Sequence, residues 1–129
     1  MVNKKITSID DLSVKDITLI AEQAIKFQNS KKLNLVKRPR NIFNLFLEPS
    51  TRTTISFELA AKNLGHNLIN INFDKSSLSK GETFMDTMST IISMKPDALI
   101  IRDKNNFSPQ DISKNINIPV INAGDGTNE

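Results

Sequence analysis

The sequence has 129 residues, of which 38% are hydrophobic and 24% charged, so it predicts one packed domain and excludes wholesale disorder. Cysteine is absent and His66 is the only histidine, which excludes disulfide frameworks, argues against zinc-hydrolase or Ser-His-Asp chemistry, and fits a cytoplasmic location. The net charge of +3 favours an anionic ligand but is too small to indicate nucleic acid, and no apolar run approaches the ~20 residues of a membrane span.

Helical and extended periods alternate along the chain. The first helix has Ser13 as its expected N-cap, with Asp16 as the capping-box partner. Gly65 is a natural end for the second helix, and Ser108-Pro109 is a favoured start for the last one. In chain order the expected elements are a helix over 13–29, a strand over 41–47, a helix over 50–65, a strand over 68–73, a helix over 83–94, a strand over 98–101, a helix from 108 and a strand over 119–122.

Four strands that alternate with helices predict an α/β fold, a doubly wound, Rossmann-like parallel four-stranded sheet with helices on both faces. The whole chain, 1–129, would form this one domain. In such sheets ligands bind outside the carboxyl ends of the strands. We therefore expect the chemistry of this protein directly after residues 47, 73, 101 and 122.

The first of these positions carries three hydroxyls and a guanidinium, in Ser50, Thr51, Arg52 and Thr53. They stand where a helix begins, and a helix N-terminus offers free N–H groups and a partial positive charge to an anion. Arginine makes fork-like contacts with phosphate oxygens. The sequence therefore favours a phosphate site, and the alternative is that Ser50 and Thr51 only cap the helix while Arg52 is a surface charge.

Two further candidates follow the second and third strands. A polar loop holds Ser77 and Lys80, which could grip an anion, or could form an ordinary solvated loop before a Thr83 helix cap. Arg102 ends the third strand at the rim where a ligand would lie. Its alternative role is a salt bridge to Asp103 or to another nearby acid.

Three motifs carry a resemblance to a known family. The segment 46–53 (FLEPSTRT), continued by Ser-Phe-Glu, resembles the carbamoyl-phosphate motif of the aspartate and ornithine carbamoyltransferases. The segments 80–83 (KGET) and 122–128 (NAGDGTN) are similar to the aspartate branch. The ornithine branch remains an alternative, although these two segments argue against it. All three motifs fall at predicted strand ends.

The resemblance implies transfer of the carbamoyl group of carbamoyl phosphate to L-aspartate, an early step of pyrimidine synthesis that needs no metal or cofactor. It implies that residues 50–53 hold the phosphate, that Thr53 also reaches the carbonyl oxygen, and that Arg102 contacts both the phosphate and the carbonyl oxygen. It implies a homotrimer in the full-length enzyme, in which Lys80 and Ser77 (or Ser76) enter a neighbouring subunit's site.

The resemblance also implies what would follow Glu129: a His-Pro-Thr-Gln segment and an aspartate-binding domain. We expect little turnover from the present chain alone and an exposed apolar surface on the first helix. Asp103 stands where many members have histidine, and we expect it to compete for Arg102. A non-catalytic phosphate-binding or subunit-assembly module is the alternative from a different class of protein.

Overall fold

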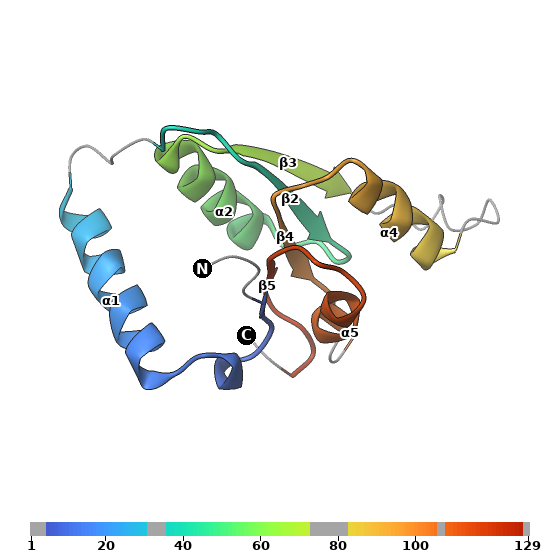
Figure 1. Ribbon diagram of the computed structural model, residues 1–129, viewed down its shortest axis with the longest axis horizontal. Coiled ribbons are helices and arrows are strands. Elements are labelled where there is room, and N and C mark those ends of the chain that lie inside the picture. Colours follow the sequence, from blue (N-terminus) through green and yellow to red (C-terminus); the bar gives the residue numbers. More distant parts are fainter. Residues whose placement is uncertain (1–4, 31–35, 73–82, 106–107, 128–129) are drawn as a thin grey trace.

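The sheet of this protein has five parallel strands in the order β1-β5-β4-β2-β3 (Figure 1). The computed structural model describes residues 5–30, 36–72, 83–105 and 108–127. The polar loop with Ser76, Ser77 and Lys80 lies outside the described residues. The strands are β1 (Lys5–Ile6), β2 (Asn41–Phe46), β3 (Asn67–Asn72), β4 (Ala98–Arg102) and β5 (Val120–Asn122).

The prediction of an α/β doubly wound parallel sheet is confirmed, but the strand count of four was wrong. The additional strand, β1, has two residues, which pair with Val120 and Ile121 of β5. Two residues are too few to show the alternation by which a strand is recognised in a sequence. Only the pairing with β5, more than a hundred residues away, defines this strand.

The helices begin close to the predicted positions. They are α1 (Val14–Asn29), α2 (Thr51–Leu64), α4 (Phe84–Ser93) and α5 (Ser108–Lys114), with a short 3₁₀ turn, η1 (Ile9–Asp11). Ser13 and Thr83 cap α1 and α4 through full capping boxes, and Gly65 ends α2 with a φ of 81°. Hydrogen bonds from the side chain and backbone of Thr83 lower the pKa of Asp86. Ser108, expected as a cap, is instead the first residue of α5.

The main core lies between the sheet and the pair of helices α4 and α5. Leu45, Leu99, Ile101 and Val120 are fully buried on this face, because alternate residues of a strand project to the same side. The other side of the core is supplied by Met88 and Ile91 of α4, Ile112 of α5, and Ile116 in the segment after α5. Figure 1 shows α2 on the opposite side of the sheet from α4 and α5, so both faces are covered.

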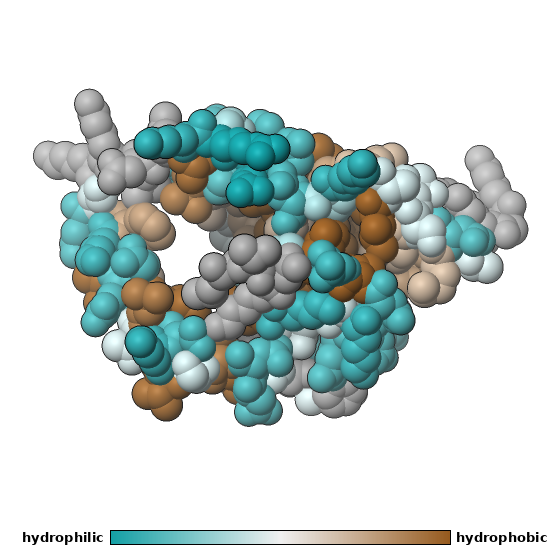
Figure 2. Space-filling view, in the orientation of Figure 1, coloured by the Kyte–Doolittle hydropathy of each residue, from teal (hydrophilic) through white to brown (hydrophobic). Residues whose placement is uncertain are grey.

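The first helix, α1, contributes nothing to this core. None of its residues is buried, and Figure 1 shows it standing apart from the sheet. Its apolar side chains are 41% exposed at Ile17, 48% at Ile20 and 58% at Ile25. Figure 2 shows hydrophobic side chains at the surface in this region. The expectation of an exposed apolar surface on the first helix is therefore confirmed.

All strands run parallel, but the order in which the chain adds them to the sheet reverses between β2 and β4. From β2 the chain moves to β3 on one side, and from β4 it moves to β5 on the other. Right-handed crossovers therefore place α2 on one face and α4 and α5 on the other. Ligands of doubly wound domains bind at the carboxyl ends of the strands beside such a reversal. This locates the candidate site at the ends of β2 and β4.

Candidate functional site

The N-terminus of α2 lacks the side-chain cap that the other long helices have. Ser50 occupies the cap position with φ −151° and ψ 85°, but its hydroxyl accepts no hydrogen bond from the first turn. It donates instead to the Thr53 Oγ1, at 2.9 Å. The first helical hydrogen bond joins the Thr54 N–H to the Ser50 carbonyl at 3.0 Å. The interpretation of Ser50 as a side-chain cap is therefore wrong.

An uncapped helix N-terminus presents backbone N–H groups and a partial positive charge to whatever lies in front of it. Thr51, Arg52 and Thr53 form the first turn of α2, where these groups are located. Thr51 and Arg52 are exposed and Thr53 is half-buried. The first turn of α2 thus has the composition and accessibility of an anion site.

A cavity of about 390 Å³ opens on the turn between β2 and α2. Both its walls come from the same short stretch of chain. It is lined by Phe46, Leu47, Glu48, Pro49, Ser50, Thr51, Thr54 and Ile55. Its hydroxyl groups come from Ser50, Thr51 and Thr54, while Arg52, Thr53 and Arg102 do not line it.

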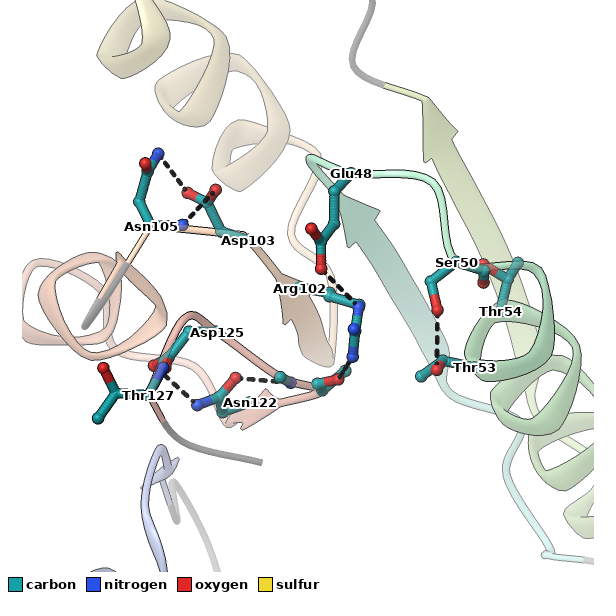
Figure 3. Close-up of polar contacts among 12 residues, drawn as sticks. Glu48, Ser50, Thr53, Thr54, Arg102, Asp103, Asn105, Asn122, Asp125 and Thr127 are labelled. Carbon is teal, nitrogen blue, oxygen red and sulfur yellow. Dashed lines mark hydrogen bonds and ion pairs between the residues drawn. The ribbon is translucent and has the colours of Figure 1, made fainter.

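The sheet brings Arg102 to the same edge as this turn. Phe46 and Arg102 are register partners at the ends of β2 and β4, and the Leu47 N–H donates to the Arg102 carbonyl at 2.8 Å. Figure 3 shows Arg102 against Glu48, which belongs to the turn between β2 and α2, with Ser50 and Thr53 farther along the same stretch of chain. The residues predicted after the first and third strands therefore lie on neighbouring elements at one edge of the sheet.

The guanidinium of Arg102 is held between an acid and a backbone carbonyl. Its Nε lies 2.8 Å from Oε1 of Glu48, and its Nη1 donates to the Ala123 carbonyl at 2.7 Å (Figure 3). The Nε contact is an ion pair without hydrogen-bond alignment, so among the described residues this buried N–H has no aligned acceptor. The Arg102 side chain is 23% exposed and that of Glu48 is 26% exposed.

Asp103 does not compete for Arg102 as expected. Its carboxylate is buried and accepts hydrogen bonds from the N–H and side-chain amide of Asn105, at 3.1 and 3.4 Å. Consecutive residues of an extended chain project to opposite sides, so Asp103 is turned away from Arg102. The acid that pairs with Arg102 is Glu48.

Glu48 is the residue that sequence reasoning did not single out: it stood only within the motif 46–53, and the partner acid of Arg102 was left unnamed apart from Asp103. One signal could have identified it: an acid that ends a buried strand, beside a hydroxyl-rich turn, faces the same edge as the ends of the neighbouring strands.

The described residues contain no group of three or more potential metal ligands among His, Cys, Asp and Glu. Within the described part of the chain, no helix has the length and hydropathy required to cross a membrane.

Together, these features define a class of protein: a doubly wound parallel domain with a candidate anion site at its topological switch point. Residues 4–129 match the family described as the aspartate/ornithine carbamoyltransferase carbamoyl-P binding domain. The chain therefore belongs to this family.

The curated relatives include the aspartate carbamoyltransferase catalytic subunits of Desulfotalea psychrophila and Pelagibacter ubique. Each is 41% identical to this chain over 131 residues, a stretch that covers 98% of this chain and 41% and 42% of the respective relative. The chain therefore spans about two fifths of the length of the curated relatives it matches.

The similar solved structures are also aspartate transcarbamoylases. The catalytic subunit of M. jannaschii aspartate transcarbamoylase superposes with a TM-score of 0.80 at 34% identity, covering 98% of this chain and 42% of that one. The Trypanosoma cruzi enzyme in complex with carbamoyl phosphate and aspartate superposes with a TM-score of 0.78 at 33% identity. That match covers 97% of this chain and 42% of the neighbour.

Proposed function

We propose that this chain is the carbamoyl-phosphate-binding part of an aspartate carbamoyltransferase. The proposed reaction transfers the carbamoyl group of carbamoyl phosphate to L-aspartate and gives N-carbamoyl-L-aspartate and phosphate, in pyrimidine synthesis. The observation that carries the proposal is the uncapped, hydroxyl-rich N-terminus of α2 beside Arg102 at the switch point. The relatives named aspartate carbamoyltransferase support the same activity.

The proposed roles of the site residues follow from where charge sits on the ligand. The dianionic phosphate would lie against the first turn of α2, where N–H groups, hydroxyls and the Arg52 guanidinium can contact its oxygens. Thr53 and Arg102 would reach the carbonyl oxygen. The proposed phosphate-binding residues are Ser50, Thr51, Arg52, Thr53 and Arg102, joined by Ser77 and Lys80 from a neighbouring subunit.

The chemistry requires only positioned donors and cations. A neutral amine of aspartate attacks the carbamoyl carbon and negative charge grows on the carbonyl oxygen. The C–O bond to phosphate then breaks, and the proton that the amine loses ends on the departing phosphate. Donors placed at the developing charge stabilise this transition state, and the loss of one commonly costs ~3 kcal/mol of barrier. Holding the two substrates in register supplies a further large share of the rate.

The proposal includes parts that lie beyond this chain. The aspartate site would come from a further domain, the working enzyme would be a homotrimer with shared sites, and its location would be the cytoplasm. Since the chain spans about two fifths of its relatives, we expect binding of carbamoyl phosphate without appreciable turnover. The competing function is a phosphate-binding or assembly module with no catalytic role, and the ornithine branch would differ only in the acceptor.

Calorimetric titration of the chain with carbamoyl phosphate and with inorganic phosphate tests the proposal. We expect both to bind and the Arg52→Ala variant to lose at least tenfold in affinity, because a charge-assisted contact is worth roughly 1.5–3 kcal/mol. Lys62→Ala is the matched control, since Lys62 is an exposed cation in the last turn of the same helix. Unchanged phosphate affinity in Arg52→Ala would count against the site.

A further inference from the structure

We propose that Gly124, with Asn122, is a positioning residue that sets the location of the Arg102 guanidinium. This inference rests on the proposed function for the consequence it predicts in ligand binding. Asn122 is the last residue of β5 and Gly124 follows it closely, at the fourth of the strand ends where the sequence predicted chemistry. Neither is expected to touch the reacting atoms, and both would act through Arg102.

The first observation is the space at Gly124. A Cβ built on this residue would lie 2.3 Å from Nη1 and 3.1 Å from Cζ of Arg102. Real Cβ atoms do not approach another heavy atom that closely, so any side chain at this position would displace the guanidinium. Gly124 also has a φ of 122°, a conformation that residues with a side chain rarely adopt. The guanidinium therefore packs directly on the backbone of Gly124.

The second observation is the hydrogen bond next to this contact. The Arg102 Nη1 donates to the Ala123 carbonyl at 2.7 Å, so the same backbone segment both packs against the guanidinium and orients it. One contact fixes the distance of approach and the other fixes the rotation. Nη1 is engaged in this way and Nε is paired with Glu48, so a ligand that contacts this guanidinium would meet Nη2 or displace Glu48.

Asn122 holds this backbone segment in place. Its Oδ1 accepts from the Gly124 N–H at 2.9 Å, and its Nδ2 donates to the Thr7 carbonyl at 2.9 Å. The Gly124 carbonyl accepts from the Asp103 N–H at 3.1 Å, which ties the segment to the end of β4. These three hydrogen bonds restrain the chain around Gly124, and that restraint in turn sets the position of Arg102.

The test compares Gly124→Ala in two backgrounds, wild type and Arg102→Lys. Lysine keeps the positive charge but has no atom at the position of Nη1, the group that the new methyl group would meet. We expect Gly124→Ala to weaken inorganic phosphate binding at least tenfold in the wild type and less than threefold in the Arg102→Lys background. Gly126→Ala, at an exposed glycine of the same loop, is the control and should leave the affinity unchanged.

Equal losses of phosphate affinity in the two backgrounds would overturn the inference, because backbone strain at position 124 acts regardless of residue 102. If Gly124→Ala does not fold, Asn122→Ala is the second variant. Its expected loss of phosphate affinity is again at least tenfold in the wild type and less than threefold in the Arg102→Lys background. If the wild type does not bind phosphate, the proposed function fails but the inference is still tested. Gly124→Ala must then lower the urea midpoint of unfolding more in the wild type than in Arg102→Lys, and equal shifts refute it.

Discussion

In the proposed site, Glu48 and a bound phosphate would compete for the guanidinium of Arg102, which leads to a prediction about ligand affinity. The Arg102 Nε lies 2.8 Å from the Glu48 carboxylate. A phosphate that draws on Arg102 must weaken this ion pair. The variant Glu48→Gln removes the competing charge while the Ala123 carbonyl still holds Nη1. We therefore expect Glu48→Gln to bind inorganic phosphate more tightly than the wild type.

The size of the effect follows from the exposure of the pair. The two side chains are 23% and 26% exposed, so solvent screens their attraction. Partly exposed ion pairs of this kind are worth up to about 1 kcal/mol. Recovering that free energy on binding corresponds to about a fivefold lower dissociation constant. The gain should shrink as salt is raised, because the pair and the ligand are both screened.

Isothermal titration with inorganic phosphate at low and at moderate ionic strength measures the effect. Glu22→Gln on α1 is the matched control, because it makes the same change in net charge at a helix that stands apart from the sheet. Equal or weaker binding by Glu48→Gln would refute the competition. An equal gain in Glu22→Gln would show that the effect comes from overall charge and not from the contact with Arg102.

Two further predictions concern stability. Leu99→Ala should lower the free energy of unfolding by about 2–5 kcal/mol, because Leu99 is fully buried. Leu59→Ala, at a residue that is 53% exposed, should lower it much less. Similar losses for the two variants in chemical denaturation would contradict the assigned core. Hydrogen bonds from the Asn41 N–H and from Arg40 lower the pKa of Asp97, so its stabilising effect is present above about pH 3.8 and is lost as pH falls through the folded-state value. Urea midpoints measured against pH should fall less steeply in acid for Asp97→Asn than for the wild type, and parallel curves would rule this out.

Local sequence was sufficient for most helices and strands because their signals are short-range. The capping boxes of α1 and α4 depend on residues three apart, and Gly65 ends α2 through its own backbone freedom. The apolar run of β2 predicted a buried strand in the same way. The alternation of these elements was enough to predict a doubly wound sheet and to place its chemistry at the strand ends.

The partners of the site side chains were not predictable in this way, since they depend on register and on contacts between distant segments. Ser50 has the composition of a cap, yet its hydroxyl binds Thr53. The charge of Asp103 predicted an ion pair with Arg102. Its side chain instead accepts from Asn105, and Glu48 forms the ion pair with Arg102. Pairing with β5 alone makes a strand of Lys5 and Ile6.

The sequence by itself therefore determined which elements form and at which edge of the sheet an anion site can be built. The tertiary structure decided how the charged side chains at that edge are paired and oriented. The physical reason is the distance along the chain over which each interaction acts. Helix caps and hydrophobic periodicity depend on residues that are only a few positions apart. By contrast, the contact between Arg102 and the backbone of residues 123 and 124 exists only once β4 and β5 lie side by side.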